Sequence, residues 1–185
     1  NTMASELLNI GKHRHITEED ARKLKLANGI EKCRGKIKEL FGLDNYEEKK
    51  MEVLLDFHMY NYAFCKENRF QSLKTSIYMS IMNEILMEDI STNDVSSTRQ
   101  SSYERFKDLM LKHSVQRPPW SVGVFSIGDA AGITDYTVNS YYRHFSLYKH
   151  IFTSRVEISF VQKNLHCVEE PPSPAPLFEA KMVDE

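Results

Sequence analysis

Two consecutive stretches of this chain, about residues 46–67 and 72–90, carry apolar side chains on more than one side of a helix. At 100° per residue, the first stretch has two opposite apolar stripes. One holds Met51, Leu55, His58, Met59 and Tyr62, and the other holds Val53, Phe57, Tyr60 and Phe64. In the second stretch, the apolar residues surround the axis: Ile77, Tyr78, Met79, Ile81, Met82, Ile85, Leu86 and Met87. Such helices are either buried between neighbouring elements or lie in an interface.

Two shorter helices are predicted before this pair. The first begins after Thr17, whose hydroxyl can cap it while Asp20 completes a capping box three residues later. Gly29 is predicted as the left-handed C-cap of this helix. The second is amphipathic and ends at Gly42.

Two further helices are predicted downstream. One begins at Ser101, which has the spacing of a capping-box pair with Glu104. The other begins after Ser126 and continues to about Phe152. The Pro-Pro pair at 118–119 separates the two, because proline has no backbone N–H to donate.

The pattern as a whole predicts an all-α chain, a compact helical domain of five to six helices with a short extended C-terminal tail. Only "RVEISFV" (residues 155–161) alternates as a strand would. We divide the 185 residues into a basic helical N-terminal arm (1–45), a helical domain (46–161) and a Pro-rich acidic tail (162–185). The tail is expected to be extended and able to dock in a groove.

Charge and hydropathy argue against two classes of partner. The net charge of −2 is not that of a nucleic-acid binder, which usually has a basic face. No apolar run reaches the roughly 18 residues of a membrane span, so no membrane partner is predicted. The three cysteines are dispersed without a C-x-x-C pair, which indicates reduced thiols in a cytosolic compartment.

Catalytic and metal-binding patterns are present only as near misses. "GVFSIG" has one residue too many before Ser126 for a nucleophile elbow, and no parallel sheet is predicted to carry it. "DISTNDVSSTRQ" begins like a calcium loop, but Asp94 replaces the required Gly and Gln100 the required Glu. The histidines lack cysteine partners at zinc-site spacing. We therefore predict no enzyme, no catalytic residues, no metal site and no cofactor.

The N-terminal arm suggests a regulatory alternative. Residues 1–42 hold nine Lys and Arg against six acids. A basic amphipathic helix can be a calmodulin target, which would make the chain a calcium-responsive module. The competing interpretation is a solvated pair of short helices, because Gly29 and Gly35 interrupt the continuity. The candidate calmodulin-binding residues are Lys23, Lys25, Arg34, Lys36 and Lys38.

The stretch "TDYTVNSYYRHFSLYKHIFT" (134–153) has two possible uses. On one continuous helix, Val138, Tyr141, Tyr142, Tyr148 and Phe152 lie within about 60° of Phe145. Such a stripe is usually core, but Tyr and Arg are also enriched at interfaces. We read the stretch as part core and part contact with other chains. With the preceding turn, the candidate partner-binding residues are Arg117, Pro118, Pro119, Trp120, Phe125, Tyr141, Tyr142, Arg143, Phe145 and Tyr148.

Segments between about residues 52 and 161 resemble the cilia- and flagella-associated protein 119 family. They are "VLLDFHMYNYAFCKENRFQSLKTS", "KHSVQRPPWSVGVFS" and "ITDYTVNSYYRHFSLYKHIFTSRVEISF". The most specific parts are Arg117-Pro118-Pro119 with an aromatic next and the run from Asp135 to Lys149. Trp120 stands where the family leads us to expect Phe, and this keeps an aromatic side chain there.

The resemblance implies a non-enzymatic structural component of the axoneme in motile cilia and sperm flagella, within a projection of the central pair of microtubules. The implied partners are a large scaffold of the sperm-associated antigen 17 type, sister small subunits and calmodulin. Microtubules would be contacted only indirectly. No catalytic residues carry over from the family.

Overall fold

The computed structural model describes residues 15–27, 29–91, 98–118 and 122–153. Its α-helices are α2 (Glu18–Leu26), α3 (Ile30–Phe41), α4 (Glu48–Glu67), α5 (Ser72–Ser91), α6 (Arg99–Ser114), α7 (Ile127–Asn139) and α8 (Phe145–Phe152). Two 3₁₀ turns, η1 (Leu43–Asn45) and η2 (Tyr142–His144), join neighbouring helices. No strand occurs in these ranges, so the all-α prediction is confirmed. The strand expected at 155–161 and the tail lie outside the described residues.

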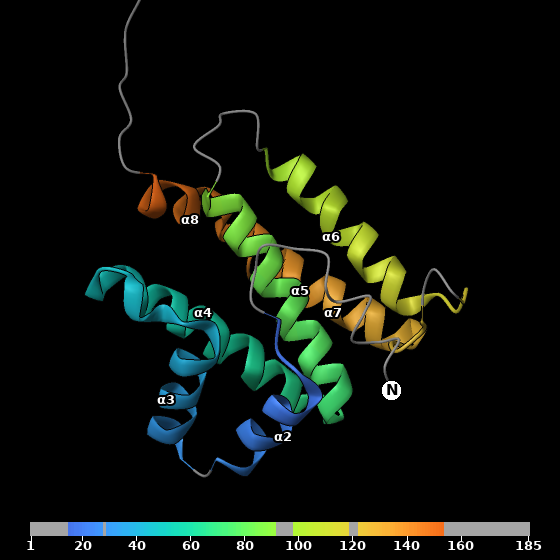
Figure 1. Cartoon of the computed structure of the whole chain (residues 1–185). Helices are drawn as coiled ribbons and strands as arrows, with labels where there is room; N and C mark the ends of the chain where they lie inside the picture. The colour runs from blue at the N-terminus through green and yellow to red at the C-terminus, as the bar shows by residue number, and fades with distance from the viewer. Residues whose placement is uncertain (1–14, 28, 92–97, 119–121, 154–185) are drawn as a thin grey trace, which may run out of the picture. The chain divides into compact units, whose positions relative to one another are not determined.

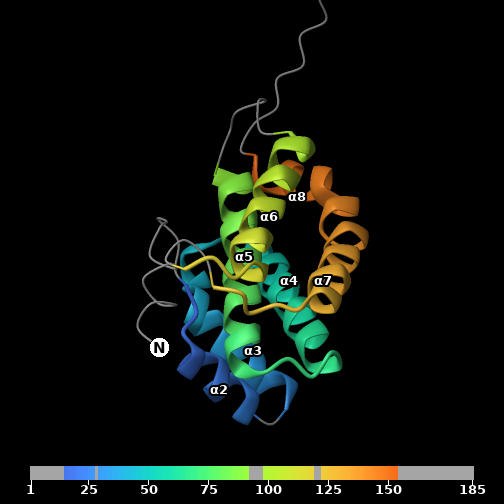
Figure 2. The ribbon, with the colours of Figure 1, turned by 90° about the vertical axis from the view of Figure 1, so that its right-hand side faces the viewer.

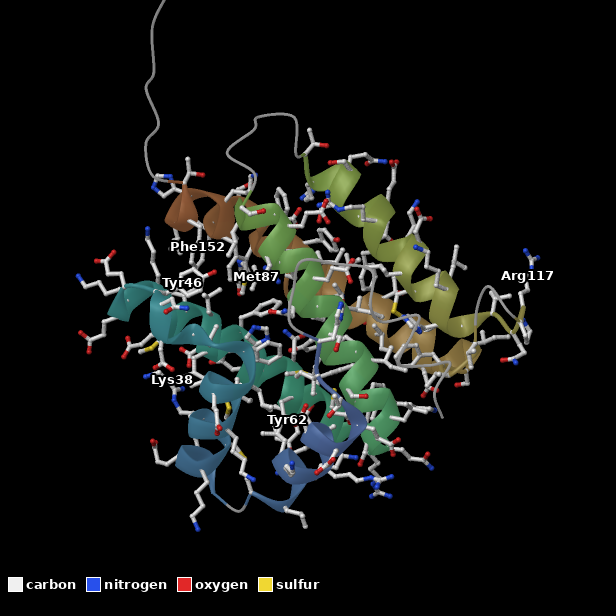
Figure 3. All side chains as sticks on the ribbon, in the orientation of Figure 1. Lys38, Tyr46, Tyr62, Met87, Arg117 and Phe152 are labelled. Atoms are coloured by element: carbon white, nitrogen blue, oxygen red, sulfur yellow. The ribbon has the colours of Figure 1, made fainter. Side chains whose placement is uncertain are left out.

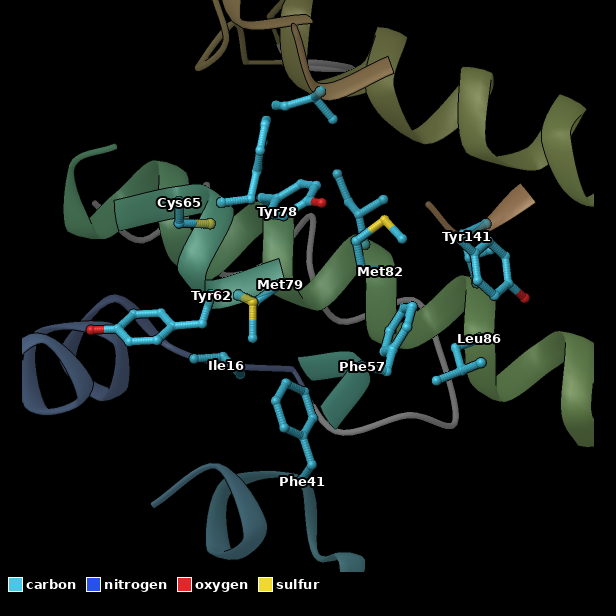
Figure 4. Packing of buried hydrophobic residues seen from close by; sticks show 14 of the residues in the cluster. Ile16, Phe41, Phe57, Tyr62, Cys65, Tyr78, Met79, Met82, Leu86 and Tyr141 are labelled. Atoms are coloured by element: carbon cyan, nitrogen blue, oxygen red, sulfur yellow. The ribbon is translucent and has the colours of Figure 1, made fainter. Parts of the chain in front are cut away.

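Helix α5 runs through the middle of the described fold. Figures 1 and 2 show α2 and α3 at one end of α5 and α8 at the other, with α4, α6 and α7 along its sides. Most of its residues are buried around the full circumference, including Ile77, Tyr78, Met79, Ile81, Met82, Ile85 and Leu86. Figure 4 shows side chains from other segments, Ile16, Phe41, Phe57 and Tyr141, lying around it. Of the two uses that the sequence left open for this helix, burial between neighbouring elements or a place in an interface, the structure shows the first, and the neighbours belong to the same chain.

Local capping chemistry sets several helix ends as predicted. The Thr17 hydroxyl accepts from the Asp20 amide (3.2 Å), and the Asp20 carboxylate accepts from the Thr17 amide (3.1 Å). Ser126 and Asp129 form the same reciprocal pair at the start of α7. Gly42 ends α3 in the left-handed conformation (φ 63°, ψ 44°), which costs glycine little because it has no Cβ.

Two predicted helix ends are wrong. Helix α2 ends before Gly29, and Ala27 is its C-cap. Gly29 has a positive φ (98°), but its extended ψ (148°) makes it the N-cap of α3 instead. Helix α6 begins at Arg99, because the Thr98 hydroxyl accepts from the Ser101 amide (3.2 Å) and starts the helix earlier than expected.

The single helix predicted from Ser126 to about Phe152 is also wrong, because the structure breaks it between α7 and α8. The Ser140 hydroxyl donates to the Tyr136 carbonyl (2.6 Å), a side-chain bond to the preceding turn of the kind that bends helices. A 3₁₀ turn follows, in which the His144 amide donates to the Tyr141 carbonyl (3.1 Å). The break changes which residues share a face: Phe145 is buried, but Val138, which the continuous wheel placed on the same stripe, is 40% exposed.

The basic arm is built into the same core as the helices that follow it. Leu24 of α2 and Ile37 of α3 are buried in the cluster that contains α4 and α5. The Tyr62 hydroxyl of α4 donates to the Leu24 carbonyl (3.2 Å), and the Ile16 amide donates to the Ser80 hydroxyl of α5 (3.0 Å). Helices from the 1–45 segment and the 46–161 segment therefore share one core.

His58 joins α3 to α4 without any hydrogen bond among the described residues. Its side chain is completely buried and stacks flat on Phe41, with ring centroids 3.7 Å apart and an interplanar angle of 7°. Burial lowers the pKa of His58 from the usual 6.5 to about 3. The imidazole ring is therefore neutral near pH 7 and packs against Phe41 as an aromatic core side chain.

Acid should weaken the fold through His58. Because its folded-state pKa of about 3 lies below the unfolded value of 6.5, its full contribution is present above pH 6.5 and is lost as the pH falls from there toward 3. Between pH 7.5 and pH 5 this residue should remove about 2 kcal/mol from the free energy of unfolding. Urea unfolding of the unchanged chain and of His58→Leu measures this difference. Equal pH dependence in the two proteins would contradict the assignment.

Candidate interaction surface

A buried carboxylate, that of Asp89, joins the end of α5 to two later segments, α6 and the residue before η2. The residue is only 1% exposed. Its Oδ2 accepts from the Ser102 hydroxyl of α6 (2.5 Å) and from the Tyr141 hydroxyl before η2 (2.7 Å). Its Oδ1 accepts from the Arg105 guanidinium (2.6 Å), which compensates the buried charge.

Further bonds extend this Asp89 network to η2 and α8. The Ser102 and Tyr142 hydroxyl oxygens are 3.1 Å apart, and Lys149 Nζ of α8 donates to the Asp89 carbonyl (2.9 Å). Burial, followed by the Asp89 carboxylate, raises the pKa of Tyr141 well above its usual value. The tyrosine is therefore a neutral donor at physiological pH. Asp89 was the first position of the sequence's imperfect calcium loop, and its carboxylate is already engaged by protein groups; residues 92–97 of that loop lie outside the described ranges.

Four of the predicted partner-binding side chains are buried inside the chain. Tyr141, Tyr142, Phe145 and Phe125 are each at most 6% exposed. Tyr141 meets Phe57 of α4 edge-on, with ring centroids 5.6 Å apart, and the half-buried Tyr148 meets the same ring at 5.7 Å. For these residues, the structure shows the core alternative left open by the sequence.

Apart from the half-buried Tyr148, the remaining predicted residues with described positions are exposed. Arg143 is exposed on η2, and Figure 3 shows Arg117 pointing outward at the edge of the molecule. Pro118 is exposed beside it, whereas Pro119 and Trp120 lie outside the described residues. Their contact with a partner remains a prediction.

The loop that leads from the Arg117 turn to α7 is fastened to the end of α6. The Val124 and Phe125 amides both donate to the His113 carbonyl (2.7 and 3.0 Å). The Gly123 amide donates to the Gln116 side-chain oxygen (2.8 Å). With Phe125 buried below, these bonds fix how α7 leaves the loop and lies beside α6.

Sequence reasoning missed a surface groove between α6 and α7. Its larger hollow is about 640 Å³ and has an apolar lining of Met110, Leu111, Ile127, Ala130, Ala131 and Val138. A second hollow of about 410 Å³ shares Val138 and continues past Tyr103 and Tyr142 to Arg99 and Arg143. We call the two hollows together the α6–α7 groove. The sequence signal for the groove was an apolar residue, Ile127, directly after the Ser126 cap. In the structure, the Ile127 side chain is 92% exposed.

A model of the CLAMP family, described as flagellar C1a complex subunit C1a-32, matches residues 60–160. The chain belongs to the CLAMP family. The CLAMP region begins within α4 and includes α5 to α8, so it holds both the Asp89 network and the α6–α7 groove. The family identifies a protein of the ciliary central apparatus, in the axoneme of a cilium or flagellum and thus cytoskeletal. The predicted location is confirmed, and the predicted resemblance is confirmed at this level.

The CLAMP match leaves out α2 and α3, which carry the candidate calmodulin-binding cations. All five of these cations make contacts within the chain. Lys23 pairs with Glu19 (2.8 Å), Arg34 with Asp56 (2.6 Å) and Lys38 with Asp44 (2.8 Å), while Lys25 donates to the Phe70 carbonyl and Lys36 to the Lys23 carbonyl (2.9 Å). The apolar faces of α2 and α3 point into the core, but Leu26 and Ile30 at the turn between them are 78% and 70% exposed.

Neither a cluster of metal ligands nor a membrane-spanning helix occurs in the same described ranges. No group of three or more His, Cys, Asp or Glu side chains there could hold a metal ion. The helices of those ranges are too short or too polar to span a membrane. Cys33 and Cys65 are buried free thiols, and burial raises the pKa of Cys65.

Removing the Asp89 carboxylate should destabilise the CLAMP region. Asp89→Ala leaves the buried Ser102 and Tyr141 hydroxyls without their shared acceptor, while Arg105 keeps its pair with Glu88 (2.9 Å), and the loss should cost about 3 kcal/mol. Tyr141→Phe removes one bond to a charged group and should cost about 2 kcal/mol. Asp108→Ala, at an exposed position of α6, is the control and should change stability by less than about 0.5 kcal/mol. Urea unfolding measures all three, and a loss for both Asp89→Ala and Tyr141→Phe as small as the control's would overturn this role.

Proposed function

We propose that this chain is a non-enzymatic assembly subunit of the C1a complex, a projection of the central pair of microtubules in motile cilia and sperm flagella. The CLAMP match over residues 60–160 carries the proposal. Within the complex, the chain binds a large scaffold of the sperm-associated antigen 17 type and sister small subunits, and touches microtubules only indirectly. The motifs around Arg117-Pro118-Pro119 and Asp135 to Lys149 further support the cilia- and flagella-associated protein 119 type.

The use of polar groups in the CLAMP region supports a structural role. Its buried carboxylate, Asp89, is saturated by Ser102, Arg105 and Tyr141 and holds helices together. Burial raises the pKa of Tyr141 and of Tyr142, so both hydroxyls stay protonated and serve as fixed hydrogen-bond donors or acceptors. These groups position helices, which an assembly subunit requires.

A calcium-responsive function through calmodulin is the second candidate. The exposed Leu26 and Ile30, next to Lys23 and Lys25, favour it. Against it, calmodulin needs several anchors on one apolar helix face, and the corresponding faces of α2 and α3 are buried against α4 and α5. Titration of the full chain with calcium-loaded calmodulin decides between the assembly function and the regulatory function. Binding at micromolar concentration would favour the regulatory function.

Localisation within axonemes tests the proposed function. We expect a density-bearing tag on the full chain to appear by cryo-electron microscopy in a central-pair projection. The tag density should disappear from axonemes that lack the projection's large scaffold. Tag density on the outer doublets, or no enrichment at the central pair, would contradict the proposal.

A further inference from the structure

The α6–α7 groove has an apolar seam along its larger hollow and a basic end in its second hollow, and Val138 lines both. Helices α6 and α7 run antiparallel. Leu111 near the end of α6 and Ile127 at the start of α7 line the larger hollow, whereas Arg99 at the start of α6 lines the second hollow with Val138 near the end of α7. From Ile127 to Val138, α7 rises about 17 Å, or roughly three helical turns. The seam is thus long enough to hold about three turns of a further helix alongside the pair.

The two walls leave apolar surface uncovered within the described fold. Helix α6 buries a narrow stripe, Ser102, Phe106 and Met110, and α7 buries only Ile133 and Thr137. Leu111 is 58% exposed, Val138 is 40% exposed, and Ile127 is more exposed than either. Between them, Ala130 and Ala131 are small, so another helix can approach the α7 backbone closely.

Charge indicates which helix would fit. The groove lining carries three cations, Arg99, Lys107 and Arg143, and one carboxylate, Asp135. The Asp135 carboxylate accepts from the side-chain amide of Asn139 (3.1 Å). Lys107 lies over the Tyr103 ring. Among the described residues, Arg99 and Arg143 form no ion pair, so the end of the groove near η2 is positive and complements acidic side chains.

We propose that the α6–α7 groove binds an amphipathic helix of another protein in the complex, with apolar residues along the seam and acidic residues against Arg99 and Arg143. This inference rests on the proposed function, because it names the chemistry of a partner. A helix suits the site because its apolar side chains, spaced i, i+4, i+7 and i+11, follow a groove walled by two helices. The fixed α6–α7 pair means that the site exists before the partner binds, which lowers the entropic cost of binding.

A designed peptide tests the chemistry on the full chain. The probe is a fluorescent, lactam-bridged helix of about 14 residues with leucines at i, i+4, i+7 and i+11 and two glutamates at one end. We expect it to bind at least about ten-fold more tightly than the same peptide with two lysines, a preference of about 1.4 kcal/mol. Arg99→Glu/Arg143→Glu should reverse the preference, and Ala131→Trp should abolish binding of both peptides.

Matched controls separate the groove from general effects. Lys32→Glu/Lys49→Glu makes the same charge change at exposed positions of α3 and α4, and Ala63→Trp places the same bulk on exposed α4. Both controls should bind the acidic peptide as the unchanged chain does. Loss of binding in the controls, or no preference between the peptides in the unchanged chain, would overturn the proposal.

Crosslinking in the native complex identifies the occupant. A photo-reactive residue replaces Ala131 in the full chain, and the linked peptide is read by mass spectrometry, with position 63 as control. An acidic amphipathic helix of another protein is expected. A second copy of this chain, or another segment of the same chain, would overturn the stated occupant. If the chain co-purifies with the complex but position 131 forms no crosslink, the groove inference fails while the proposed function stands. If the chain is absent from the complex, the proposed function fails, and the peptide titration alone decides whether the groove binds an acidic helix.

Discussion

The burial of α5 on all sides is the constraint on which the described fold depends. A helix with Tyr78, Met79 and Met82 all below 1% exposed cannot remain in water, because each such side chain contributes about 1.5–3 kcal/mol only when covered. The chain supplies that cover from α2, α4, α6 and α8 and from the segment before α2. Even the basic arm, which resembled a regulatory appendage, takes part: α2 packs on α5, and Leu24 and Ile37 are buried in the common core.

The Asp89 network fixes the arrangement of the helices that cover α5. Apolar packing is tolerant of small shifts, whereas a buried carboxylate with three donors accepts only one arrangement of its partners. Asp89 therefore fixes how α6 and the η2 turn lie against α5. Arg143 lies within this turn, whereas the bonds of the Val124 and Phe125 amides to the His113 carbonyl hold the start of α7 beside α6. A subunit whose contact surface is set before assembly loses less entropy when it joins a complex.

Local chemistry was enough to predict much of the fold. The capping pair at Thr17, the helix start after Ser126, the stop at Gly42 and the apolar faces of α5 all follow from neighbouring residues. The break at Ser140 was missed, because the wheel treated the stretch as one regular helix. The partner of Asp89 was also missed, because Tyr141 lies 52 residues away in sequence and only the tertiary fold brings it near. Aromatic content could not separate core from interface, since both uses favour the same side chains, and burial assigned Tyr141, Tyr142 and Phe145 to the core.

Hydrogen exchange of the full chain, free and in the native complex, tests most directly whether the chain folds before assembly and binds its partners along α6 and α7. Amide protection reports the free energy of local opening for each helix. The account predicts that the amides of α5 are the slowest to exchange already in the free chain. It also predicts that assembly adds protection chiefly along α6 and α7. Rapid exchange throughout α5 in the free chain, with protection appearing only in the complex, would show that the fold forms on binding and would contradict the account.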